Sequence, residues 1–141
     1  MRNMLINREY ERLDAILEDY QQAYEKDVNN EDTLLYAYYQ TFFVNDPAYE
    51  QMLDIWVKNH SDSYQPYLAR AAYYYHLGWE SRGHEWATET SKKQFSDMQK
   101  FFEKANADIK NVLDRKQNNI VPYYLLINIH IHTYHMHSYI H

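Results

Sequence analysis

The chain has 141 residues, of which only two are glycine, three are proline and none is cysteine, and its formal net charge is −6 with neutral histidines. This length fits one domain. So few glycines disfavour a nucleotide-binding α/β enzyme and a small β-barrel, which need glycine-rich loops or tight hairpins. The lack of cysteine excludes disulfides, thiol nucleophiles and zinc–thiolate sites. A helical domain is therefore expected.

Apolar residues recur every three or four positions along most of the chain, which is the spacing of one face of an α-helix. The first helix is predicted over residues 8–26, with a stop near Asn29 and Asn30. A second helix begins at Glu31 or Asp32. The inward residues of these two helices are Leu13, Ile16, Leu17, Tyr20, Tyr24, Leu35, Tyr38, Tyr39 and Phe42.

A third helix follows Asp46, whose carboxylate is placed to cap it ahead of Pro47. The fourth helix is predicted to be capped by Asp62 or Ser63, with Pro66 in its first turn, where a missing N–H does no harm. The inward residues of these two helices are Tyr49, Met52, Leu53, Trp56, Leu68, Ala71, Ala72, Tyr75 and Trp79.

Gly78 falls inside this fourth helical pattern, where glycine costs about 1 kcal/mol relative to alanine. It predicts close packing with a neighbouring helix, or a helix end near Gly83. The pattern is weak over residues 81–96. A long helix follows over about residues 94–115, and Pro122 opens the last helix. Since every predicted element is helical, we expect an all-α domain of roughly six or seven antiparallel helices.

Three helix–turn–helix passages follow one another, which is the organisation of stacked α-solenoids. The stretch from Tyr67 to Gly78 resembles the first helix of a tetratricopeptide-like (TPR-like) repeat, although no strict period of about 34 residues is present. The predicted fold is therefore a short TPR-like α-solenoid of stacked helical hairpins over residues 1–129. Residues 130–141 form a His-rich tail that is expected to lie outside the core.

A more specific resemblance spans residues 5–129. The segments that carry it are Trp56-Val57, His60-Ser61-Asp62-Ser63-Tyr64, Leu68-Ala69-Arg70 and Gly78-Trp79-Glu80-Ser81-Arg82-Gly83. They resemble a bacterial family of unknown function, DUF4034, whose members carry a Trp, a Pro-Asp-Ser turn and an Ala-Trp-x-x-Arg-Gly segment at comparable spacing. The chain departs from this pattern at Ser61, where the family more often has proline, and at Gly78, which replaces alanine. The resemblance implies a helical-repeat fold and no particular reaction.

Two groups of residues are candidates for binding a protein partner. On a helix Trp79, Arg82 and Trp86 share one face, and Trp and Arg are frequent hot spots of interfaces. The alternative is that both Trp rings lie in the core and that Arg82 pairs with a carboxylate inside the fold. The second group comprises three tyrosines off the assigned apolar stripes, which offer apolar area and a hydroxyl to a partner. The candidate partner-binding residues are Tyr36, Tyr73, Tyr74 and Arg82.

The tail from His130 to His141 holds five of the eight histidines. Such tracts bind Zn²⁺, Ni²⁺ or Cu²⁺ through neutral imidazole. No Cys, Asp or Glu joins the histidines to complete a ligand set, so no metal site and no cofactor is assigned. Metal binding through the tail stays an alternative function.

Charge and motif content indicate the class of function. An acidic chain without a basic stripe is a poor nucleic-acid binder. No run reaches the roughly 18 apolar residues of a membrane span, and a soluble cytoplasmic protein is expected. Without catalytic motifs, we predict a non-catalytic protein-interaction module rather than an enzyme, with a basic protein favoured as its partner. A bacterial immunity or antitoxin protein that neutralises a toxin by direct binding is the sharper alternative.

Overall fold

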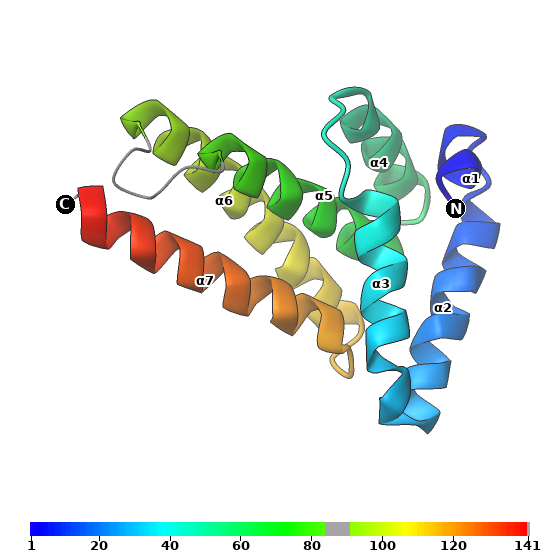
Figure 1. The fold of residues 1–141 in the computed structure, drawn as a ribbon. Coiled ribbons are helices and arrows are strands. Elements are labelled where there is room, and N and C mark those ends of the chain that lie inside the picture. The colour runs from blue at the N-terminus through cyan, green and yellow to red at the C-terminus, as the bar shows by residue number, and fades with distance from the viewer. Residues whose placement is uncertain (84–90, 141) are drawn as a thin grey trace.

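The computed structural model describes residues 1–83 and 91–140, the last of these, 135–140, by their backbone alone. The described residues form seven α-helices and one short 3-10 helix and contain no strand, so the all-α prediction is confirmed (Figure 1). The first short helix was not predicted. The elements are α1 (Arg2–Ile6), α2 (Tyr10–Lys26), η1 (Val28–Asn30), α3 (Glu31–Phe42), α4 (Ala48–Asn59), α5 (Gln65–Arg82), α6 (Lys92–Arg115) and α7 (Ile120–Ile140).

The predicted contact of Asp46 with the start of α4 is present, although the N-cap residue itself is Pro47. Asp46 Oδ1 accepts a hydrogen bond from the N–H of Ala48 at 3.0 Å, at the start of α4. The predicted cap of α5 by Asp62 or Ser63 is wrong, because α5 begins with Tyr64 at its N-cap and no side-chain cap bond. The turn before α5 instead closes on itself through a backbone bond from Ser63 N to the carbonyl of His60 at 3.0 Å.

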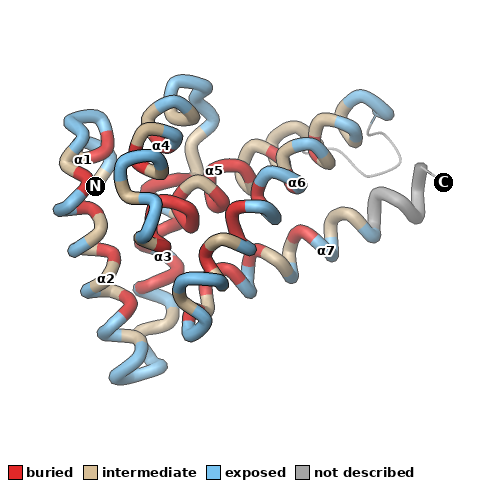
Figure 2. Tube along the Cα trace, turned by 180° about the vertical axis from the view of Figure 1, so that it is seen from behind, coloured by how far each residue is buried: buried red, intermediate tan, exposed pale blue. Residues whose placement is uncertain are grey.

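Helix α5 is the central element of the fold. It contacts α2, α3, α4, α6 and α7, and it is buried along most of its length, as the red segments of Figure 2 show. A helix that is apolar nearly all round is covered on several sides. Its buried residues are Gln65, Pro66, Tyr67, Leu68, Ala69, Ala71, Ala72, Tyr73, Tyr74 and Gly78.

The closest approach in the core is between α5 and α6 at Gly78. A Cβ atom added to Gly78 would lie 2.5 Å from Cε1 of Phe102, which is far inside van der Waals contact. Phe102 is itself buried and stacks on Tyr75, with ring centroids 5.8 Å apart. The prediction that Gly78 marks close helix packing is confirmed.

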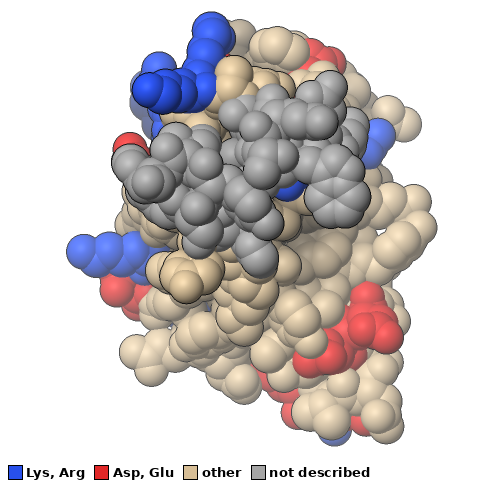
Figure 3. All heavy atoms as spheres, turned by 60° about the vertical axis from the view of Figure 1, so that its left-hand side comes forward, with Lys and Arg blue, Asp and Glu red and all other residues tan. Residues whose placement is uncertain are grey.

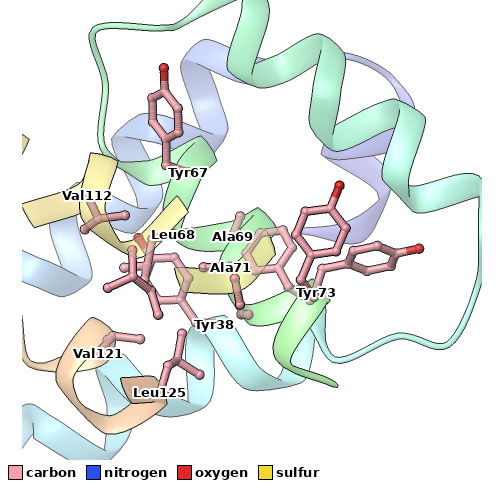
Figure 4. Packing of buried hydrophobic residues seen from close by; sticks show 14 of the residues in the cluster. Tyr38, Tyr67, Leu68, Ala69, Ala71, Tyr73, Val112, Val121 and Leu125 are labelled. Carbon is pink, nitrogen blue, oxygen red and sulfur yellow. The ribbon is translucent and has the colours of Figure 1, made fainter. Parts of the chain in front are cut away.

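A second part of the core lies where four helices meet. Figure 4 shows Tyr38 of α3 beside Leu68 of α5, together with Val112 of α6 and Val121 and Leu125 of α7. All five side chains are buried. Because residues from the second half of α6 and the first half of α7 meet α3 here, the N-terminal and C-terminal helices share one core.

Two carboxylates of α2 hold the end of α4 and the start of α5. Asp14 Oδ1 accepts from Nε1 of Trp56 at 3.0 Å, and its Oδ2 is hydrogen-bonded to Nδ1 of His60. One turn further on, Glu18 Oε2 accepts from the hydroxyl of Tyr64 at 2.8 Å. Both carboxylates thus satisfy polar groups at the end of α4 and in the turn that leads to α5. The Trp56 ring, which donates to Asp14, is completely buried.

Arg70 links α5 to both α4 and α6. Its guanidinium donates to both oxygens of Asp108, at 2.9 and 2.8 Å, and to Oδ1 of Asp54 at 2.9 Å. The Asp108 side chain is 4% exposed, whereas that of Asp54 is 51% exposed. Burial raises the pKa of Asp108, and the charge and hydrogen bonds of Arg70 oppose that rise. The buried part of this cluster is therefore a bidentate Arg70–Asp108 ion pair, and removing either partner would strongly lower the free energy of unfolding.

Among the described side chains the last core residue of α7 is Ile129, where the predicted domain ends, but the helix itself does not end there. Helix α7 continues to Ile140, and the ring of His132 lies on that of Trp79, with centroids 4.3 Å apart. Trp79, which the sequence places among the inward residues of the fourth helix, is half-buried at this contact. Within the described ranges, no helix combines the length and the apolar character that crossing a bilayer requires.

Replacing Gly78 by alanine is expected to lower the free energy of unfolding. Alanine gains about 1 kcal/mol of helix propensity, but overpacking a filled core costs about 1–3 kcal/mol, and the stacked Phe102 ring leaves little room for adjustment. Chemical denaturation of Gly78→Ala, Phe102→Leu and the double variant measures the coupling. The double variant should be more stable than the sum of the single changes predicts. Strict additivity would contradict the close contact.

The two carboxylates on Arg70 provide a matched pair for a second test. Asp108→Asn should lower the free energy of unfolding by about 3 kcal/mol, because it leaves the charged Arg70 guanidinium facing a buried neutral amide. Asp54→Asn should lower the free energy of unfolding by less than about 1 kcal/mol, because the Asp54 side chain is about half exposed. Urea denaturation of both variants measures these two losses of unfolding free energy. Equal losses would show that burial does not set the strength of this cluster.

Candidate functional site

A cleft of about 320 Å³ opens between α5, α6 and the segment that runs from the α3–α4 connection into the first turn of α4. On α5 its residues occupy positions 73, 77, 80 and 81, which fall on one face of a helix. We call it the Tyr73 cleft. Its lining residues are Asn45, Pro47, Glu50, Tyr73, Leu77, Glu80, Ser81 and Phe101.

The rim of the Tyr73 cleft already holds a cation between a carboxylate and aromatic rings. Lys104 Nζ lies 3.7 Å from Oε2 of Glu50. The same ammonium lies 5.3 Å from the ring centroid of Tyr74 and 5.9 Å from that of Phe101. These distances are those of cation–π contacts. At this rim the Glu50 carboxylate and the Tyr74 and Phe101 rings therefore lie close enough together to contact the same positive charge.

The two tyrosine hydroxyls at the cleft are both donors. Tyr73 donates to the carbonyl of Asp46 at 2.9 Å, and Tyr74 donates to Oε2 of Glu50 at 2.8 Å. Burial raises the pKa of Tyr73 to about 12, and the charges of Glu50 and Asp46 add to the rise. Burial and the bond to Glu50 likewise raise the pKa of Tyr74. Both phenols therefore stay neutral, and the negative charge of the cleft comes from its carboxylates.

Ser81 and His76 complete the polar groups near the cleft. The hydroxyl of Ser81 donates to the carbonyl of Leu77 at 2.8 Å, so it is engaged with its own helix and not with a base. His76 Nε2 lies 3.8 Å from Oε1 of Glu80, and its ring stacks on Phe43 with centroids 5.1 Å apart. Burial lowers the pKa of His76, against the opposing charge of Glu80. Ser81 and His76 are thus both in contact with neighbouring groups of α5.

The structure separates the predicted partner-binding residues. Tyr36 is 61% exposed on α3. Tyr73 and Tyr74 are only 1% and 7% exposed, so the expectation that they lie open on the surface is wrong, because α4 and α6 cover α5 on two further sides. Arg82 lies at the end of α5 with its guanidinium carbon 5.2 Å from the centre of the Trp79 ring. Their role in binding a partner stays a prediction.

Only Tyr73 among the predicted residues lines the cleft. Glu50, Glu80 and Phe101 were missed as site residues, although the spacing of positions 73, 77, 80 and 81 could have indicated the α5 wall. The other walls come from α6 and from the segment that joins α3 to the first turn of α4, and no spacing within one helix reveals that these segments meet.

The described residues do not assemble a metal centre. Within this part of the chain, no group of three His, Cys, Asp or Glu side chains is placed to hold a metal ion. His132 of the predicted metal-binding tail lies instead against Trp79. His135, His137 and His141 lie outside the described side chains, so metal binding through the tail stays a prediction.

The lowered pKa of His76 predicts a pH-dependent stability. The unfolded chain, with an ordinary pKa of about 6.5, binds a proton more readily than the folded chain does. The free energy of unfolding should therefore fall as the pH drops below about 6.5 towards the pKa of the folded state. His76→Gln should show a smaller loss between about pH 8 and pH 5 in urea denaturation. The same loss of stability in His76→Gln and in the wild-type chain would contradict this assignment to His76.

Comparison with known proteins gives one match. Neither a curated protein nor a solved structure matches the chain. The model of one family, described as "Domain of unknown function (DUF4034)", matches residues 1–138. The matched region extends beyond the segments that carry the resemblance. It covers α1 to α6 completely and α7 up to residue 138. The chain therefore belongs to the DUF4034 family.

Proposed function

We propose that this chain is a non-catalytic protein-interaction module whose Tyr73 cleft binds a Lys or Arg side chain of a basic partner. The observation that carries the proposal is the meeting of Glu50 and Glu80 with the Tyr73 and Phe101 rings in one cleft. A carboxylate forms charge-assisted hydrogen bonds to an ammonium or guanidinium group. The partly exposed Phe101 ring adds cation–π attraction and covers the methylene stem of the bound side chain.

The charge of the whole molecule supports a basic partner. The net charge of −6 produces a negative potential that accelerates encounter with a positively charged protein. The cleft volume of about 320 Å³ lies at the lower end of the range for ligand pockets. It suits one long side chain and not a large cofactor. The binding energy would then come from one anchored residue and the surface around it.

The proposal extends to the arrangement of the helices and to the compartment. Consecutive helices α2 and α3, α4 and α5, and α6 and α7 are in contact as pairs, which supports a TPR-like stack of hairpins. Such stacks commonly bind extended segments of other proteins. We place the protein in the bacterial cytoplasm on the basis of its composition, its acidic charge and its resemblance to a bacterial family.

The test measures the binding of an oligo-arginine peptide, with an oligo-glutamate peptide as the blank, by isothermal titration calorimetry. The variant Glu50→Gln/Glu80→Gln removes both cleft carboxylates. It should weaken binding about tenfold or more, because a hydrogen bond to a charged group contributes about 1.5–3 kcal/mol. The matched control, Glu11→Gln/Glu103→Gln, removes the same charge from exposed sites on α2 and α6 outside the cleft.

The control variant should weaken binding much less than the cleft variant, through the long-range field alone. Equal losses in both variants would show that the peptide binds by overall charge and would overturn the assignment of the cleft. Circular dichroism of each variant establishes that the fold is intact, which is necessary because Glu50 also accepts the hydroxyl of Tyr74.

A further inference from the structure

Helix α7 has an apolar side that faces solvent. Its 21 residues include no Lys, Arg, Asp or Glu, in a chain that has 14 Lys and Arg and 20 Asp and Glu. Four large side chains, Tyr123, Ile127, Ile131 and Tyr134, are between 44% and 74% exposed. Monomeric proteins seldom expose such a contiguous apolar row without a partner for it.

The four residues form one row along the helix. Their spacing of four, four and three places them on a single face, and the row is about 16 Å long at a rise of 1.5 Å per residue. The opposite face carries Val121, Leu125 and Ile129, which are buried against the body. A helix that is apolar on two sides is typical of one that is covered on two sides. We call the exposed row the outer face of α7.

The order of residues on the outer face fits a second copy of the same chain. The row reads Tyr, Ile, Ile, Tyr, so it is nearly the same in both directions. If two copies pack antiparallel about a twofold axis, Ile127 faces Ile131 of the other copy. Tyr123 then faces Tyr134. Such self-complementarity is the property of an isologous interface, in which each contact occurs twice.

Charge also favours a second copy over a basic partner at this face. Two chains that each carry a charge of −6 repel one another, unless they meet where neither has a charged group. The outer face of α7 supplies such a region. In the view of Figure 3, a broad tan area between the blue and the red side chains likewise has no Lys, Arg, Asp or Glu. A basic partner would find no carboxylate on α7 to pair with.

We propose that two copies of this chain associate through the outer faces of α7 in an antiparallel arrangement. The proposal is independent of the Tyr73 cleft, since none of the lining residues of that cleft comes from α7. Four side chains on one helix make a small interface compared with the roughly 800 Å² per partner of a stable complex. The dimer is therefore a weak one that forms in the micromolar range.

Sedimentation velocity of the full chain tests the proposal over about 5 to 500 µM. The wild-type chain should shift from monomer to dimer, and Ile127→Gln/Ile131→Gln should raise the dissociation constant at least about tenfold. The matched control, Ile6→Gln/Val28→Gln, removes two equally exposed apolar side chains on α1 and η1 and should leave the dimer unchanged. A wild-type chain that stays monomeric throughout, or a dimer indifferent to the α7 variant, would overturn the proposal.

The orientation is tested by cross-linking, which is clean because the chain has no cysteine. An antiparallel pair places residue 127 opposite residue 131. A mixture of Ile127→Cys and Ile131→Cys chains should therefore oxidise mainly to the mixed disulfide, faster than either variant alone forms its own. Preferential cross-linking of each variant with itself would show a parallel pair and would refute the proposed geometry.

Discussion

The contact of Gly78 with Phe102 sets how closely α6 lies on α5, and most other parts of the structure follow from that distance. Arg70, about two turns before Gly78 on α5, reaches Asp108 across the same interface and donates to both carboxylate oxygens. Phe101, the neighbour of Phe102, then reaches the Tyr73 cleft. A larger residue at position 78 would move α6 and so change the ion pair and the cleft wall together. The core and the candidate site therefore depend on the same missing Cβ atom.

Part of the acidic character of this protein is structural. Asp14, Glu18 and Asp108 accept hydrogen bonds from Trp, Tyr and Arg groups of other helices. Each buried donor that they satisfy would otherwise cost about 1–3 kcal/mol. At the rim of the cleft Glu50 has both roles, because it accepts from Tyr74 and also pairs with Lys104. The net charge thus results partly from how the helices are joined and is not only a means of staying in solution.

The sequence predicts helix positions well here because the apolar spacing is local, and each predicted helix begins within a few residues of the observed one. It predicts the surroundings of α5 poorly, because a helix that is covered on several sides has no single apolar stripe. Tyr73 and Tyr74 were assigned to the surface for that reason, and both are buried. The cleft was missed because its walls come from three parts of the chain. The extension of α7 beyond residue 129 was missed because histidines were taken to mark the end of the core.

The hydrogen bond from Gln21 of α2 to the carbonyl of Asn118, 2.6 Å long, has a consequence for how the chain is made. Lys116 and Asn118 also donate to Glu25 of α2, so the turn between α6 and α7 closes onto the second helix across more than ninety residues. During synthesis from the N-terminus, α2 lacks these partners until residues 116–118 have left the ribosome. Helix pairs that could form earlier therefore wait for the α6–α7 turn before these contacts are complete, and closing so long a loop slows folding relative to a bundle with only local contacts.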